Sequence, residues 1–134
     1  MFLINKQVDY AVQFLLALSV LPKNEFLSIS SFSKKRNISF LFLQKIARKL
    51  KSAGFIEAEK GSQGGYFLKV GPATLTLKDI VEALEGRYAA VACMKDVSDC
   101  PVTQLCLSKN VLSKVQEEIL GTMQKYTLAT MAKM

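Results

Sequence analysis

Apolar positions near the start of the chain recur at intervals of three and four residues, the spacing of one face of an α-helix. This pattern predicts an amphipathic helix over residues 4–21 that ends before Pro22. Shorter helices are expected after Ser28 and after Ser39, because a serine hydroxyl can accept a hydrogen bond from a free amide of a first helical turn. Asn37 suits the tight turn between these two helices.

The third predicted helix has one apolar face and one basic face. Helical spacing puts the apolar residues on a stripe that can pack in a core, and Gly54 is a typical C-terminal stop. The apolar stripe comprises Leu43, Ile46, Ala47 and Leu50, and the other face carries Gln44, Lys45, Arg48 and Lys49. One helix can therefore pack on one side and bind a partner on the other.

Beyond Gly54 the pattern changes from helical spacing to the short runs that are typical of strands. Residues 55–60 and 65–70 are expected to form two strands, joined by a Gly61-Ser62-Gln63-Gly64 turn. The order of helix, helix-turn-helix and hairpin is that of a winged helix-turn-helix domain. The predicted fold class is therefore mainly α with a small β-hairpin.

The second half of the chain is expected to hold two more helices. Thr76 and Asp79 resemble a capping box at the start of a helix that Gly86 stops. Residues 87–106 have little periodicity and are expected to form a loop. Residues 107–126 predict a long last helix. Its apolar stripe comprises Val111, Val115, Ile119, Met123 and Tyr126, with Leu112 and Leu120 beside it.

Charge is distributed unevenly over the 134 residues. Residues 1–70 carry eleven lysines and arginines against four acids, whereas residues 71–134 carry seven of each sign, so the first half holds the whole net charge of +7. Between Lys34 and Lys51 there are seven cations and no acid. This is expected of a surface that displaces counterions from a phosphate backbone, although a basic face can also serve only solubility.

In a helix-turn-helix the second helix of the motif enters the major groove of DNA. The groove candidates are Leu41, Phe42, Gln44 and Lys45, and those for phosphate or guanine are Arg48 and Lys49. The Gln44 amide can read adenine, and Leu41 or Phe42 can contact a thymine methyl group. The alternative, equally expected, is that Phe42 is a core residue.

The hairpin and the helix N-termini complete the candidate DNA interface. A glycine-rich wing lets the backbone lie close to the sugar-phosphate wall, while Lys60, Ser62 or Gln63 reaches the minor groove. The alternative is a hairpin tip without a binding role. Ser28 and Ser39, at the starts of the two motif helices, are included among the candidate DNA-binding residues.

Three cysteines lie close together at Cys93, Cys100 and Cys106, with the spacing C-x6-C-x5-C. An odd number is not a secretory disulfide framework, so a reducing, cytoplasmic location and a metal or redox role are expected. The chain has no histidine, so a fourth metal ligand must be an oxygen donor or come from a partner chain. Three unligated cysteines in a loop are the alternative.

Export and membrane insertion are not expected. The early apolar stretch Ala11–Leu21 is interrupted by Gln13 and Ser19 and lacks a small-residue cleavage site. It is also too short to span a bilayer.

Several motifs together give the chain a likeness to a known family. It resembles the IscR/NsrR family of winged-helix regulators, often called the Rrf family, which sense iron-sulfur status, nitric oxide or redox state. The matching pieces, besides the three cysteines, are Asp9-Tyr10-Ala11, Ile38-Ser39 with Leu43, Gly54-Phe55-Ile56, the wing from Gly61 to Tyr66, Leu77 to Val81 with Ala83 and Glu85, and Thr127-Leu128.

The resemblance implies a homodimer that binds double-stranded DNA and represses transcription. It implies that Cys93, Cys100 and Cys106 ligate a [2Fe-2S] or [4Fe-4S] cluster, that the long last helix pairs with its copy, and that the cluster state alters DNA affinity. Two departures are a first cysteine gap one residue longer than in the best-known members and the missing histidine ligand. NsrR-like members are similar in using an acid of the partner subunit, and Asp9 stands at the matching place. The alternative is that Asp9 is an ordinary surface carboxylate and binds no metal.

The sequence thus predicts three parts and one main function. Residues 1–86 are expected to bind DNA, residues 87–106 to form a sensor loop, and residues 107–134 to dimerise. A cluster-free thiol-disulfide switch and an iron-sulfur carrier or adaptor are the alternatives. An enzyme with a cysteine nucleophile, and hence a small-molecule substrate, is not expected, because no histidine base, phosphate-binding glycine loop or paired carboxylates are present.

Overall fold

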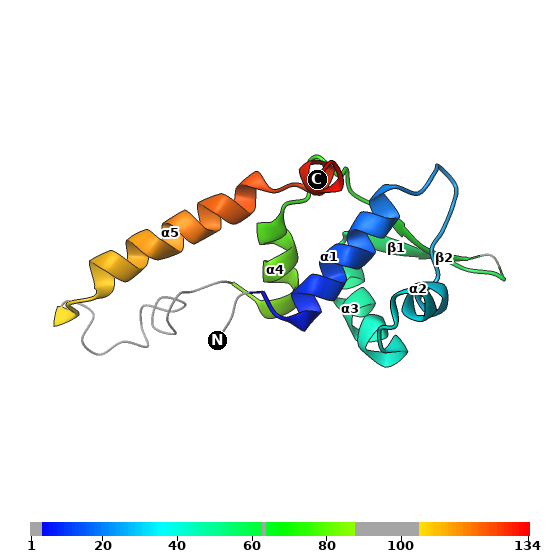
Figure 1. Ribbon diagram of the computed structural model, residues 1–134, viewed down its shortest axis with the longest axis horizontal. Coiled ribbons are helices and arrows are strands. Elements are labelled where there is room, and N and C mark those ends of the chain that lie inside the picture. Colours follow the sequence, from blue (N-terminus) through cyan, green and yellow to red (C-terminus); the bar gives the residue numbers. More distant parts are fainter. Residues whose placement is uncertain (1–3, 63, 88–104) are drawn as a thin grey trace.

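The computed structural model describes residues 4–62, 64–87 and 105–134 and confirms the predicted fold class (Figure 1). It is mainly helical, with one two-stranded antiparallel hairpin among the described residues. The elements are α1 (Lys6–Ser19), α2 (Ile29–Arg36), α3 (Phe40–Ser52), β1 (Ile56–Glu59), β2 (Gly65–Leu68), α4 (Leu77–Glu85), α5 (Lys109–Lys125) and α6 (Leu128–Ala132).

The predicted helix caps are confirmed. The Ser28 hydroxyl accepts a hydrogen bond from the Ser31 amide at 3.0 Å, and that of Ser39 accepts one from Phe42 at 3.4 Å. Thr76 and Asp79 form a reciprocal capping box. Asn37 ends α2 in the left-handed region at φ 54°, where asparagine is tolerated better than most residues. Local hydrogen bonding therefore defines these element boundaries.

Helix α1 is shorter than the predicted range 4–21. It begins at Lys6 because the Asn5 side chain accepts a hydrogen bond from the Val8 amide. It ends at Ser19, and the Leu21 amide already bonds three residues back, to the Leu18 carbonyl. Pro22 disfavours helical backbone in the residue before it, which explains the early end.

The core lies where α1, α3, α4 and α6 meet. The predicted stripe of α3 is buried, with Leu43, Ile46, Ala47 and Leu50 each at most 1% exposed. It packs with the buried side of α1, and Ile80, Val81 and Leu84 of α4 belong to the same cluster. The apolar stripe of α3 thus faces inward and its basic side faces outward.

The wing is a short hairpin that projects from this core (Figure 1). Its register runs from Ile56 opposite Leu68 to Glu59 opposite Gly65. Leu27 adds a third extended segment through two backbone hydrogen bonds with Tyr66, of 3.0 and 2.8 Å. Strand β2 of the wing is therefore held against the connection between α1 and α2.

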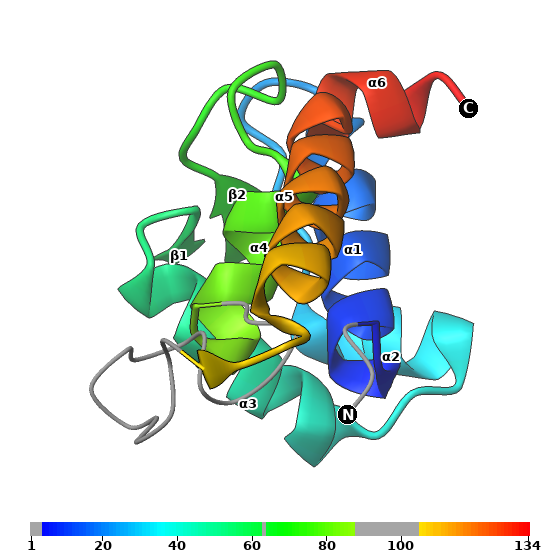
Figure 2. The same cartoon turned by 90° about the vertical axis from the view of Figure 1, so that its left-hand side faces the viewer.

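The C-terminal end of the chain returns to the core. The predicted last helix 107–126 is observed as α5, which starts at Lys109 and ends at Lys125, and the periodicity does not predict the short α6 that follows. Leu128 is fully buried, its amide bonds to the Leu75 carbonyl at 2.9 Å, and α6 packs against α1 (Figure 2). Most of the predicted loop 87–106 lies outside the described residues.

Candidate nucleic-acid interface

Helix α3 presents all four predicted groove-binding residues on one surface. A hollow of about 460 Å³ is lined by Leu41, Phe42, Gln44, Lys45 and Arg48. Leu41 is 70% exposed, and Lys45 and Arg48 are exposed as well. In Figure 2, α2 and α3 lie together at the end of the molecule opposite α6, so this surface is clear of the C-terminal elements.

Phe42 is packed against α1 and also forms part of the outer surface of α3. Its ring contacts Tyr10 of α1 edge to face, with 5.7 Å between the centroids, and it is half-buried. It also lines the hollow on α3. Phe40, which the apolar pattern does not single out, is 43% exposed at the first position of α3 and adds a second aromatic ring near the helix start.

The structure separates the cations of this region into free and engaged side chains. Within the described residues, neither Lys45 nor Arg48 has an acidic partner. Lys51 and Lys69 both lie 3.7 Å from Glu57, so their charge is partly neutralised. The sequence cannot show this division, because it depends on which acid the hairpin brings beside α3.

Lys49 differs from its neighbours on α3. Its ammonium group donates hydrogen bonds to the Gln7 side-chain oxygen at 3.0 Å and to the Leu84 carbonyl at 3.3 Å. These hydrogen bonds within the protein compete with the predicted contact of Lys49 to phosphate or guanine.

Helix α2 adds further positive charge. Lys34 and Lys35 are exposed, and the Arg36 guanidinium lies 5.8 Å from the centre of the Phe32 ring. The hydroxyls of Ser28 and Ser39 are engaged as helix caps, each with one amide of the first turn. The other amides at the starts of α2 and α3 have no partner within their helices.

The wing tip carries polar side chains on a sterically restricted backbone. Lys60 and Ser62 are exposed, and Gln63 lies outside the described residues. Gly61 has φ 120°, and a Cβ on Gly64 would lie 2.2 Å from the Glu59 carbonyl oxygen. Glycines at these positions keep the turn narrow, as a wing that approaches DNA requires.

Of the predicted cluster ligands, the structure describes Cys106 and Asp9. The Ser108 hydroxyl, 3.5 Å from the sulfur, together with the Ser108 backbone, lowers the pKa of the Cys106 thiol and so favours the thiolate that binds metals. Asp9 is exposed on α1 and accepts a hydrogen bond from Gln13 at 3.1 Å. Cys93 and Cys100 lie outside the described residues, and no metal-binding group is complete within the described ranges.

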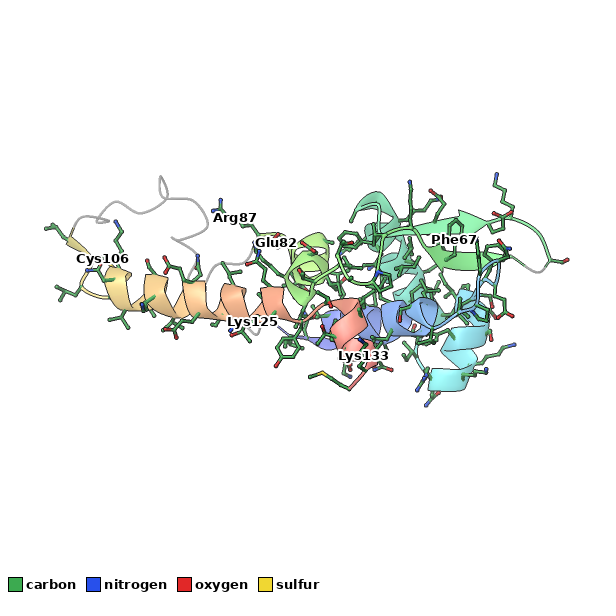
Figure 3. All side chains as sticks on the ribbon, turned by 90° about the horizontal axis from the view of Figure 1, so that it is seen from above. Phe67, Glu82, Arg87, Cys106, Lys125 and Lys133 are labelled. Atoms are coloured by element: carbon green, nitrogen blue, oxygen red, sulfur yellow. The ribbon has the colours of Figure 1, made fainter. Side chains whose placement is uncertain are left out.

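The position of Cys106 separates it from the DNA-reading elements. Figure 3 shows Cys106 at the far end of α5, opposite the end of the molecule that carries Phe67 of β2. Figure 1 also shows the start of α5 well away from α1 of the same chain. A ligand on α1 therefore lies far from Cys106 within one protomer.

The helix-turn-helix, the exposed basic face of its second helix and the glycine-rich hairpin define a winged helix-turn-helix DNA-binding protein. A family model described as Rrf2, an iron-dependent transcriptional regulator, matches residues 4–134. The chain belongs to the Rrf2 family of DNA-binding transcription regulators, which is not a family of enzymes.

Individual relatives agree with this assignment. The chain is 29% identical over 126 residues to the HTH-type transcriptional regulator NsrR of Halalkalibacterium halodurans, which is 93% of this chain and 86% of that protein. Among solved structures, T. potens IscR matches with a TM-score of 0.77 and 25% identity over 97% of this chain and 85% of that one.

A third relative shares the fold. CymR, the global cysteine regulator of B. subtilis, matches with a TM-score of 0.75 and 24% identity over 99% of this chain and 98% of that one. In the described part of this chain, no helix is both long and apolar enough to cross a membrane.

Proposed function

We propose that the chain represses transcription by gripping a specific duplex with α3 in the major groove and the wing in the adjacent minor groove. The observation that carries this proposal is the hollow on α3, where apolar and amide side chains lie together with two basic side chains that have no acidic partner among the described residues. Such a surface offers contacts to base edges and to phosphates at once.

Each proposed contact follows from chemistry and position. Gln44 pairs with adenine, Leu41 and Phe42 contact thymine methyl groups, and Lys45 and Arg48 bind phosphate or guanine. Lys60, Ser62 and Gln63 of the wing reach the minor groove. The amides of the helix starts capped by Ser28 and Ser39 face phosphates, because helix N-termini favour anions.

The direct test is selection of duplexes from a random pool, followed by binding measurements at several salt concentrations. We expect one preferred sequence with two half-sites about one helical turn apart, and affinity that falls steeply with salt. Equal binding to all duplexes would favour the carrier or adaptor alternative instead.

Arg48→Ala tests the placement of the recognition helix. We expect about a tenfold loss of affinity for the selected duplex, because a base or phosphate contact of an arginine contributes about 1–3 kcal/mol. Lys51→Ala is the matched control, since it removes the same charge from the same helix but from a side chain paired with Glu57. Equal losses in the two variants would show that only net charge matters.

We propose that two copies pair through α5. Val111 and Val115 on its apolar stripe are 65% and 42% exposed, and Leu107 just before it is 100% exposed. Farther along the same helix, a hollow of about 460 Å³ lies between Ile4, Leu77, Val115 and Tyr126, among others. An apolar stripe of this length on a projecting helix is typical of a protein–protein interface.

We propose that Cys93, Cys100 and Cys106 hold an iron-sulfur cluster and that the partner subunit's Asp9 supplies the fourth ligand. The donor set fits iron, because thiolates are the usual cluster ligands and the pKa of the Cys106 thiol is already lowered. The distance between the start of α5 and α1 within one protomer supports a carboxylate from the partner. When bound, the cluster supplies a redox-sensitive or nitric-oxide-sensitive centre.

The cluster would control DNA binding by a shift between two arrangements of the dimer. A cluster held between subunits favours the arrangement that keeps its ligands together, and its loss releases that preference. DNA affinity changes if the two recognition helices are spaced differently in the two arrangements.

Spectroscopy of anaerobically purified protein tests the cluster. We expect iron, sulfide and visible absorption in the native chain, and loss of the native spectrum in Cys100→Ala and Cys106→Ala. An Asp9→Ala variant should alter the spectrum without abolishing it. A native chain without iron or sulfide contradicts the proposal.

A thiol-disulfide switch is the second candidate, and the lowered pKa of the Cys106 thiol favours it because a thiolate attacks disulfides and oxidants readily. Thiol counting before and after mild oxidation separates the two candidates. A metal-free chain that loses two thiols and changes its DNA affinity supports the switch.

A further inference from the structure

Four hydrogen-bonded side chains connect α1 and its N-cap residue with α3 and α4 at one end of the helical core. The Lys49 ammonium of α3 bonds to the Gln7 side-chain oxygen, and the Gln7 amide nitrogen donates to a Glu85 carboxylate oxygen at 2.9 Å. The Asn5 side chain donates to the same Glu85 oxygen. Residues 80 positions apart in the sequence are thus joined directly.

Lys49 also completes the end of α4. It donates to the Leu84 carbonyl, which is one of the last carbonyls of α4 and has no partner within that helix. A cation at this position is favoured by the negative end of the helix dipole. The Lys49 ammonium therefore has two partners of its own protein and a favourable field around it.

Helix α1 contacts α3 at two positions. Tyr10 packs against Phe42, and Gln7 bonds to Lys49. Tyr10 and Gln7 are separated by three residues, and Phe42 and Lys49 by seven, so each pair lies on one side of its helix. One aromatic contact near the start of α3 and one polar contact near its end together restrict rotation and tilt of the helix.

We propose that Lys49, Gln7 and Glu85 are positioning residues of the DNA interface, which orient the recognition helix, and that Lys49 is not a phosphate ligand. This inference rests on the proposed binding of DNA by α3. It divides the basic face into Lys45 and Arg48, which contact DNA, and Lys49, which fixes the helix that carries them.

Salt-dependent binding distinguishes the two roles of a lysine. Each lost phosphate contact lowers the slope of log affinity against log salt by about 0.9, whereas the loss of a positioning residue leaves the slope unchanged. The probes are the duplex that the native full-length chain selects from a random pool and a scrambled duplex of the same composition.

We expect Lys45→Ala to lower the slope by about 0.9 on both duplexes. Lys49→Ala is expected to keep the slope, to weaken binding to the selected duplex about fivefold, as for one lost hydrogen bond, and to leave the scrambled duplex nearly unaffected. Gln7→Ala should weaken binding to the selected duplex in the same way, because it removes the bond to Lys49. The double variant should lose less than the sum of the two single losses, since the two variants share that bond.

Two controls separate positioning from general damage. Gln13→Ala changes the same residue type on the same helix, where the side chain bonds to Asp9, and it should leave selectivity unchanged. Glu85→Gln keeps an acceptor for Gln7 and should retain most of the selectivity that Glu85→Ala loses. Unfolding curves of all variants show that each is folded at the assay temperature.

The inference is overturned if Lys49→Ala lowers the salt slope by about 0.9, as the loss of a phosphate contact does, or if Gln7→Ala and Gln13→Ala have the same effect. Additive losses in the Gln7 and Lys49 double variant also overturn it. If the chain selects no duplex, or if Arg48→Ala changes nothing, the proposed function itself fails, so the two failures are distinguishable.

Discussion

Gly65 of the wing is sterically constrained by neighbouring backbone, and the sequence pattern of the hairpin does not reveal this. A Cβ on Gly65 would lie 2.6 Å from the Leu27 carbonyl carbon and oxygen, and both atoms belong to backbone that is hydrogen-bonded to Tyr66. The short distance arises because the extended segment at Leu27 packs directly on the first residue of β2. The wing therefore tolerates only glycine at this position.

Gly65→Ala should destabilise the protein by about 1–3 kcal/mol, because the backbone of Leu27 and Ser28 must move to admit one methyl group. Chemical denaturation measures this loss. Gly121→Ala is the control, since nothing lies within 4 Å of its Cβ position in α5, and alanine there should be neutral or slightly stabilising. Equal stability of the two variants would contradict the close packing at Leu27.

Charged residues are the second feature that depends on individual positions. The cluster of cations between Lys34 and Lys51 is evident in the sequence and favours DNA binding. Which of them are free is decided by Glu57 beside Lys51 and by Gln7 and Leu84 beside Lys49. These partners come from other elements, so a count of charges in the sequence does not show which cations have partners within the protein.

Among the elements, α4 illustrates how much local chemistry contributes. Its start is set by the reciprocal bonds of Thr76 and Asp79, of 3.2 and 3.0 Å, and its end by Gly86 at φ 81°. Both features are recognisable in the sequence because they involve residues three positions apart or a single glycine.

Thr76→Ala should lower the free energy of unfolding by about 0.5–2 kcal/mol, because the Asp79 amide loses its hydrogen-bond acceptor. Thr76→Ser retains the hydroxyl and should recover most of this loss. Denaturation of both variants measures the difference. A serine variant as unstable as the alanine variant would assign the effect to the lost methyl group instead.

The two C-terminal helices behave differently as elements. Helix α6 has only the residues Leu128–Ala132, too few for a clear periodic pattern, and it is held by the Thr127 cap and by Leu128 in the core. Helix α5 is long and periodic, yet Val111 of its apolar stripe remains exposed while Met123 is buried. Periodicity predicts α5 as a helix but does not say which part of its stripe packs within the same chain.

At the scale of the whole molecule, the exposed half of the α5 stripe predicts an association equilibrium. Val111→Glu should weaken dimerisation at least about tenfold, because a charge would have to enter an apolar interface. Analytical ultracentrifugation measures the shift to monomer. Val20→Glu is the control, since Val20 is an equally exposed valine, 70% against 65%, on a different part of the surface. Dimers that survive Val111→Glu unchanged would place the interface elsewhere.

The sequence alone determined the winged helix-turn-helix order, the buried and basic faces of α3, the caps at Ser28, Ser39 and Thr76, and the family resemblance. These features are local: a helical stripe repeats within two turns, and a cap joins residues three positions apart. The three cysteines also stand out by spacing alone, and their role as cluster ligands stays a prediction.

Only the tertiary structure decided the return of α6 to the core, the exposure of the α5 stripe, the pairing of Lys51 with Glu57 and the bonds of Lys49 to α1 and α4. Each joins elements distant in the sequence or depends on how much of a side chain its neighbours cover. Such contacts follow from packing of the whole chain, which no window of the sequence contains.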